Sequence, residues 1–162
     1  MKIAAILMLV VCLAALCGVG YLYMSASITV SSVETIASDA VSQSEYYQTL
    51  REQLENGSFV GTLFSQDYPD DPERDVFYTY TVQISNRSFL PAEVVELQIM
   101  PVTGDILQIG DPSEHTLVSG HTVSLSATLL TEKQLHNIRE LTVTYYVWGL
   151  PFSAKLTSQA QQ

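Results

Sequence analysis

An acidic segment contains the residues that most readily suggest chemistry. Asp67–Asp75 carries five carboxylates in nine residues. Calcium needs several oxygen ligands at about 2.3–2.6 Å, and this segment could supply some of them. However, the spacing and central glycine of an EF-hand loop are absent, and Pro69 and Pro72 stiffen the segment. We therefore favour a solvated loop, and keep a calcium-dependent binding protein as a less favoured alternative.

Histidines and serines give no firmer catalytic pattern. The chain has three histidines, His115, His121 and His136, and no two of them lie four residues apart on a predicted helix, as a helical zinc site requires. Ser119 and His121, taken with Asp105, suggest a hydrolase triad, but no Gly-x-Ser-x-Gly turn accompanies them. The eight glycines are scattered singly, so no phosphate-binding loop is present. We predict no catalytic residue, no metal site and no cofactor, and hence no enzyme.

The N-terminal segment is apolar over a length that matches a bilayer. No charged residue occurs from Ile3 to Tyr23, and about 20 apolar residues at 1.5 Å each span the roughly 30 Å hydrocarbon core. Residues 1–24 therefore predict a retained transmembrane signal-anchor. A cleaved signal is the first alternative, with Ser25-Ala26-Ser27 as its cleavage site. A lipoprotein is less favoured, because bulky residues precede both Cys12 and Cys17.

The charges predict the orientation of this anchor. Lys2 and the free amine lie before it, whereas the next basic residue is Arg51. The positive-inside rule therefore predicts a single-pass protein of the cell membrane with a cytoplasmic N-terminus and an extracytoplasmic domain. The short basic region at the N-terminus favours a bacterial cell surface. A net charge of −10 argues against nucleic acid and against peripheral docking on anionic lipid.

Residues 25–57 show helical periodicity. Val33, Ala40, Tyr47 and Leu54 are seven residues apart, which predicts a short helical juxtamembrane stalk. Ser31 with Glu34 could form an N-terminal capping box, and Asn56-Gly57 a C-terminal cap. The stalk could form a weak homodimer as a coiled coil, pack as a single helix on its own domain, or remain a loose spacer.

From residue 58 to residue 157 the period changes to two, which is typical of antiparallel strands with one buried face. Turn residues separate seven or eight such segments. The sequence therefore predicts an all-β, immunoglobulin-like antiparallel β-sandwich, preceded by the transmembrane helix and the juxtamembrane helix. Residues 158–162 form a polar tail. The longest alternating segments are 76–85, 94–99, 123–129, 141–148 and 152–156.

Two aromatic residues form the candidate interaction face. On the strand predicted at 141–148, Tyr146 and Trp148 alternate with Tyr145 and Val147. If they are exposed, a Tyr/Trp pair of this kind is typical of a protein-binding hot spot. The competing interpretation is that a neighbouring segment, such as the stalk helix, covers them.

The region from about Tyr80 to Thr157 resembles the LEA14-like or WHy (water stress and hypersensitive response) type of immunoglobulin-like sandwich. The similar pieces are a strand ending in Asn86, a Pro-led strand from Leu90 to Leu97, a Gly turn leading into the strand after Gly120, and a Tyr-Val-x-Gly ending at Gly149. Asn86 is followed by Arg87, where the family usually has proline. The resemblance implies a non-enzymatic domain in which Asn86 has a structural role, bonding the backbone of its turn.

These observations favour a membrane-anchored domain with a structural or protein-interaction role. An accessory subunit of a membrane or envelope complex, recognised through its anchor and stalk, is the main alternative. The sequence does not identify a protein partner.

Overall fold

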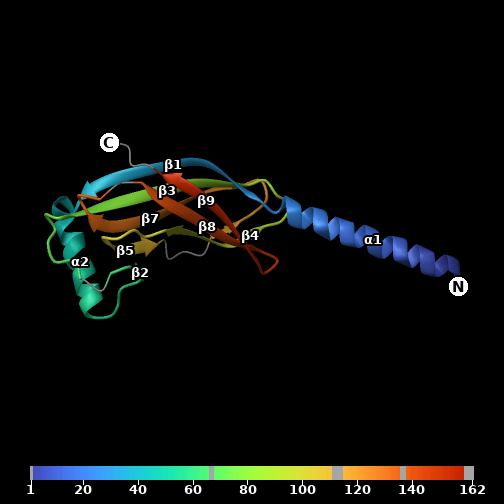
Figure 1. The fold of residues 1–162 in the computed structure, drawn as a ribbon, viewed down its shortest axis with the longest axis horizontal. Helices are drawn as coiled ribbons and strands as arrows, with labels where there is room; N and C mark the ends of the chain where they lie inside the picture. The colour runs from blue at the N-terminus through green and yellow to red at the C-terminus, as the bar shows by residue number, and fades with distance from the viewer. Residues whose placement is uncertain (1, 66–67, 111–114, 136–137, 159–162) are drawn as a thin grey trace.

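After a long N-terminal helix, the chain folds into two antiparallel sheets (Figure 1). The computed structural model describes residues 2–65, 68–110, 115–135 and 138–158. The five-stranded sheet has the order β1-β3-β7-β5-β2 and the four-stranded sheet the order β6-β4-β8-β9. The prediction of an immunoglobulin-like antiparallel β-sandwich after an apolar helix is therefore confirmed. The elements are α1 (Lys2–Ser25), β1 (Ile28–Asp39), η1 (Ala40–Gln43), α2 (Ser44–Glu55), β2 (Thr62–Leu63), β3 (Asp75–Asn86), β4 (Ala92–Ile99), β5 (Asp105–Gly110), β6 (His115–Leu117), β7 (Thr122–Glu132), β8 (Arg139–Val147) and β9 (Leu150–Ser158).

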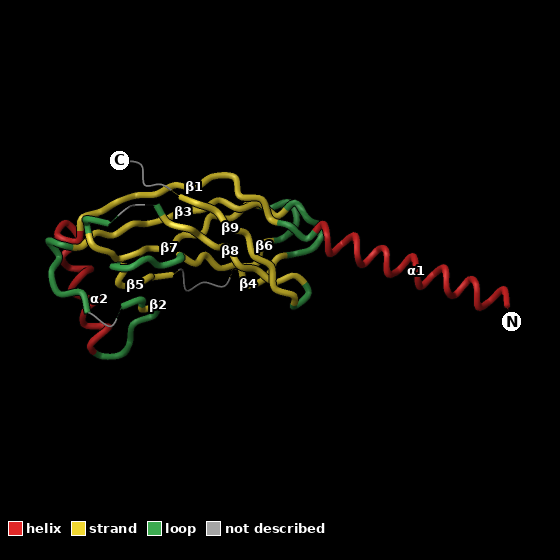
Figure 2. Tube along the Cα trace, viewed as in Figure 1, coloured by secondary structure: helices red, strands yellow, loops and turns green. Residues whose placement is uncertain are grey.

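Helix α1 projects away from the sandwich (Figure 2). Its 23 residues Ile3–Ser25 have a mean hydropathy of 2.8, and none of its most apolar stretch is buried against the rest of the protein. An apolar helix left without a protein partner is suited to lipid. Length and composition make α1 a candidate membrane span, although a cleaved signal sequence shares both properties.

The main core lies between the two sheets. Alternate residues of β3 (Tyr80, Val82 and Ile84) face inward and are fully buried. Leu141 and Val143 of β8 line the opposite side of the same cluster. The period-two pattern therefore places one face of each sheet in the core, as expected for a sandwich.

A second cluster covers one end of the outer face of the five-stranded sheet. Helix α2 buries Tyr47, Leu50 and Leu54 against Phe77 and Leu130. These two strand residues alternate with the inward-facing ones, so α2 lies outside the sandwich. The predicted cap at Asn56-Gly57 is confirmed. Gly57 has a φ of 67°, and the amides of residues 57 and 58 donate to the carbonyls of residues 54 and 53, which is the Schellman arrangement.

The predicted helical stalk over residues 25–57 is wrong in its first half. Residues Ile28–Asp39 form β1, which pairs with β3 along its whole length, so the capping box at Ser31 does not form. The register shifts between Val30 and Ser32. Val30 and Val33 consequently both pack on the core, three residues apart. The seven-residue spacing from Val33 to Leu54 thus crosses from a strand into η1 and α2, and does not lie on one helix.

The coiled-coil dimer predicted for this segment loses its basis for the same reason. Val33 lies on a strand, while Ala40, Tyr47 and Leu54 are buried in the second cluster of the same chain. The alternative of a helix that packs on its own domain is correct for α2. The sandwich therefore begins at Ile28 and not at residue 58.

The two ends of the sandwich differ in what they carry. We define the near end as the end from which α1 leaves; it holds the β3–β4, β6–β7 and β8–β9 turns (Figure 1). The far end is the opposite one, with α2, the acidic loop Tyr68–Arg74 and the β4–β5 turn.

The side chain of Asn86 holds the turns of the near end together through hydrogen bonds. Its Nδ2 donates to the carbonyls of Leu90 (2.7 Å) and Leu117 (2.9 Å), and its Oδ1 accepts from the amide and hydroxyl of Ser88. The Asn86 residue is 1% exposed. Its predicted structural role, bonding the backbone of its turn, is therefore confirmed, and it joins two neighbouring turns.

Candidate functional site

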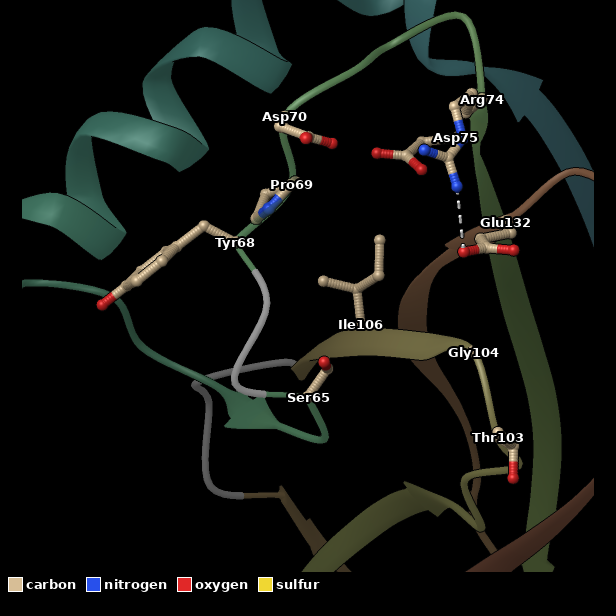
Figure 3. Close-up of a pocket in the computed structure, with 10 residues that line it drawn as sticks. All are labelled: Ser65, Tyr68, Pro69, Asp70, Arg74, Asp75, Thr103, Gly104, Ile106 and Glu132. Carbon is tan, nitrogen blue, oxygen red and sulfur yellow. Dashed lines mark hydrogen bonds and ion pairs between the residues drawn. The ribbon is translucent and has the colours of Figure 1, made fainter.

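A cleft at the far end, lined by described residues, is a candidate site (Figure 3). It has a volume of about 720 Å³ and is bounded by the acidic loop, the start of β3 and the β4–β5 turn. Figure 3 shows the carboxylates of Asp70 and Asp75 and the side chain of Arg74 on one side, and Ile106 on the other. Tyr68 at its rim is 61% exposed.

A buried hydrogen bond holds Asp75, one of the residues that line this cleft. The hydroxyl of Tyr47, on α2, donates to Asp75 Oδ2 at 2.6 Å, and both residues are almost fully buried. Burial is the main cause that raises the pKa of the Asp75 carboxyl, with Asp70 and Asp71 adding to it, while the bond from Tyr47 opposes it. Burial likewise raises the pKa of the Tyr47 hydroxyl. Both groups therefore hold their protons more tightly than in water.

Exposed ion pairs border the cleft. Arg74 Nη2 lies 3.5 Å from Glu132 Oε1, and both residues line the cleft. Next to this pair, outside the lining, Lys133 Nζ lies 3.1 Å from Asp39 Oδ1. The amide of Lys133 also donates to the carbonyl of Arg74 at 2.8 Å. Exposed pairs of this kind contribute at most about 1 kcal/mol each, so they orient the rim more than they stabilise the fold.

The acidic loop gives no support to a calcium site. Over the described ranges, which omit Asp67, no three His, Cys, Asp or Glu side chains gather closely enough to hold a metal ion. Instead, Asp71 Oδ1 accepts from the amide of Glu73 at 2.9 Å and thereby closes the turn. The calcium-dependent alternative thus has no structural argument, and the solvated loop remains our interpretation.

The suggested hydrolase triad does not assemble. Asp105 begins β5 at the far end, whereas Ser119 and His121 lie in the β6–β7 turn at the near end. The ring Nδ1 of His121 lies 3.0 Å from the carbonyl oxygen of Ser119, and the hydroxyl of Ser119 donates to the carbonyl of Ser88. His136 lies outside the described residues.

Asp105 has a structural partner that the sequence did not reveal. Its two oxygens accept from Arg139 Nε at 3.0 Å and from Nη2 at 2.7 Å. The side chains of Asp105 and Arg139 are 0% and 1% exposed. Asp105 Oδ2 also accepts from the amide of Val102. Because the two residues are 34 positions apart, only the pairing of distant strands brings them together.

The predicted interaction residues lie at the near end and are exposed. Tyr146 is 40% exposed and Trp148 is 60% exposed, so α2 does not cover them. We predicted Trp148 on the strand 141–148, and this is wrong. β8 ends at Val147, and Trp148-Gly149 form a two-residue turn with φ values of 53° and 72°. The predicted protein-binding role of the two aromatic side chains stays a prediction.

The raised pKa of Asp75 gives a testable pH dependence. A carboxyl whose pKa is higher in the folded state favours folding below its unfolded pKa of about 3.9, and this contribution disappears as the pH rises through the folded pKa. Asn at position 75 does not titrate and still accepts from Tyr47. We therefore expect Asp75→Asn to gain stability relative to the wild type between pH 4 and pH 7. Urea unfolding of the full chain in detergent micelles measures this difference, and parallel pH curves would contradict it.

No protein-family model matches the chain, and no curated protein matches it. Solved structures with similar folds include the yeast GGA1 GAE domain–P21, at 13% identity and a TM-score of 0.40, covering 63% of this chain and 100% of that one. A FixG-related protein from Vibrio parahaemolyticus has 14% identity and a TM-score of 0.35, covering 54% and 82%. A protein from Archaeoglobus fulgidus has 10% identity and a TM-score of 0.32, covering 83% and 99%. Similarities this distant carry no argument about function.

Proposed function

We propose that this chain is a single-pass membrane protein whose β-sandwich stands outside the cytoplasm and has a structural or protein-interaction role without catalysis. One observation carries the proposal: the cleft is lined by residues of the far end, and the unburied apolar helix leaves the sandwich at the opposite end (Figure 1). With α1 in a bilayer, the cleft is presented away from the membrane. The resemblance to the LEA14-like or WHy type supports a domain of this non-enzymatic kind.

The far end has the chemistry of a protein contact. It combines exposed apolar side chains, Val60, Tyr68 and Val102 among them, with the carboxylates of Asp70 and Asp71. Aromatic and apolar anchors beside charges are typical of interaction surfaces, with the charges guiding the approach. A partner with basic residues around an apolar patch complements this end.

Cross-linking in intact cells tests the proposal. A photo-cross-linking phenylalanine analogue replaces Tyr68 in the full chain, and the matched control carries it at Gln83, which is exposed on the outer face of the five-stranded sheet. We expect a discrete cross-linked product in the membrane fraction from position 68 and none from position 83. Protease added outside intact cells should remove the sandwich.

The arms of this experiment separate the parts of the proposal. A chain recovered in the soluble fraction would refute anchoring, and a sandwich protected from external protease would refute the orientation. Equal products from both positions would refute a specific contact at the cleft. When an unrelated anchor replaces α1, a product that persists at position 68 indicates recognition by the sandwich, whereas its loss favours the accessory subunit recognised through its anchor.

A further inference from the structure

We propose that the near end of the sandwich lies in the interfacial layer of the membrane that holds α1, with the side chain of Trp148 inserted among the lipid headgroups. The occupant of this surface is then the bilayer and not a second protein. This inference rests on the proposed anchoring by α1 and adds a second, independent contact with lipid.

Exposed apolar side chains gather on the turns of the near end. Phe89 in the β3–β4 turn is 71% exposed, Val118 in the β6–β7 turn is 53% exposed, and Trp148 and Leu150 at the β8–β9 turn are 60% and 48% exposed. Hydrogen bonds join the first two turns: the amide of Gly120 donates to the carbonyl of Asn86 at 2.8 Å. Two of the turns are thus tied together, and exposed apolar side chains of all three turns lie at the same end of the sandwich.

The β8–β9 hairpin contacts the end of α1 and the residue that follows it. The rings of Tyr23 and Phe152 lie 5.2 Å apart, and the hydroxyl of Tyr145 donates to the carbonyl of Ala26 at 3.3 Å. From Phe152 the hairpin continues for three residues to Gly149, which is about 10 Å at the usual rise of a strand. It continues toward the side on which α1 projects (Figure 1). The turn therefore extends from the contact with Tyr23, at the C-terminal end of α1, toward the side on which the bilayer would lie.

The backbone at Trp148 is unfavourable for a tryptophan. Two-residue turns with positive φ at both positions strongly prefer Asn-Gly, and a bulky residue with φ of 53° is an outlier. Such outliers are concentrated at functional positions. The large exposed ring makes no contribution to the core that would explain its presence. Tryptophan is, however, enriched at the interface between a bilayer and water, where its ring and its N–H both find partners.

The charges of the near end permit this contact although the whole chain is acidic. In the described part of the chain, the three turns carry no Asp or Glu, and Arg87 is exposed beside Phe89. The acidic loop and the carboxylates of α2 lie at the far end. The net charge of −10 argues against docking on anionic lipid as a whole. Glu93, which is exposed opposite Tyr146 on the neighbouring strand, is the acidic residue nearest to these turns in the described part of the chain, and the turns themselves carry none.

Trp148 is the only tryptophan of the chain, so its fluorescence reports on this one position. The full chain is reconstituted into phosphatidylcholine vesicles, with and without bromine atoms high on the acyl chains, and flotation shows whether it is inserted. We expect tryptophan emission shifted to shorter wavelength, loss of most of this emission with brominated lipid, and weak quenching by aqueous acrylamide.

A relocated tryptophan is the matched control. The variant Trp148→Phe/Tyr68→Trp places the reporter at the far end, where residue 68 is equally exposed; its emission should be quenched by acrylamide and not by brominated lipid. A chain that floats with the vesicles but keeps Trp148 open to acrylamide and unaffected by bromine overturns this inference and leaves anchoring intact. A chain that does not float overturns both proposals.

Discussion

A fragment of residues 58–162 is expected to remain unfolded, whereas residues 26–162 fold. The shorter fragment lacks β1, which pairs with β3 over its entire length, and it lacks the Tyr47, Leu50 and Leu54 side chains that α2 buries. Burial of three such side chains is worth roughly 5–9 kcal/mol, which is comparable with the whole stability of a domain, about 5–15 kcal/mol. Amide dispersion in NMR spectra and cooperativity of urea unfolding distinguish the two states.

An intermediate fragment shows which element matters. Relative to residues 26–162, the fragment of residues 40–162 keeps η1 and α2 and lacks β1. The edge of β3 and the core residues that pack against Val30 and Val33 therefore become exposed. We expect weak or no cooperative unfolding for this fragment as well. Cooperative unfolding of residues 58–162 would show that the sandwich is complete without the preceding segment, and would restore residue 58 as its boundary.

Arg139→Met is expected to destabilise the protein by about 3–5 kcal/mol. Removing one member of a buried ion pair leaves the other charge without compensation in a medium of low polarity. Here the carboxylate of Asp105 would remain, 0% exposed. Chemical unfolding of the full chain in detergent micelles measures the loss.

Two further variants test this explanation. The double variant Arg139→Met/Asp105→Asn removes both charges, keeps an oxygen for the amide of Val102, and should recover part of the lost stability. Lys155→Met breaks an exposed pair with Glu140 at 2.7 Å and should cost less than about 1 kcal/mol. Equal losses for the buried and the exposed pair would contradict the role of burial.

The strands could be predicted from the sequence because one face of each is buried. The alternation of Tyr80, Val82 and Ile84 with polar residues persists along β3, and it matches the side that faces the core. The failure at β1 has a different cause. Val33 packs on the core between the sheets, whereas Ala40, Tyr47 and Leu54 are buried in the second cluster, so the seven-residue interval joins a strand to a helix.

The candidate sites could be predicted only in part. The alternation places Tyr146 on the face opposite buried Tyr145, but it left open whether that face is covered. The turn at Trp148 was missed because tryptophan is not a residue that signals a turn. The pairs Arg139–Asp105 and Tyr47–Asp75 join residues 34 and 28 positions apart. Such pairs depend on how strands and α2 are arranged in space, for which no local pattern exists.

The position of β1 also determines how the domain responds to mechanical force. The anchor continues directly into Ile28, at the near end, and β1 runs to Asp39 at the far end, antiparallel to β3. A pull between the bilayer and anything attached at the far end therefore acts along the strand. The hydrogen bonds of the β1–β3 ladder then resist in shear, all together, and do not open one after another. The first strand of the sandwich is thus a tether that can hold tension without peeling away from its sheet.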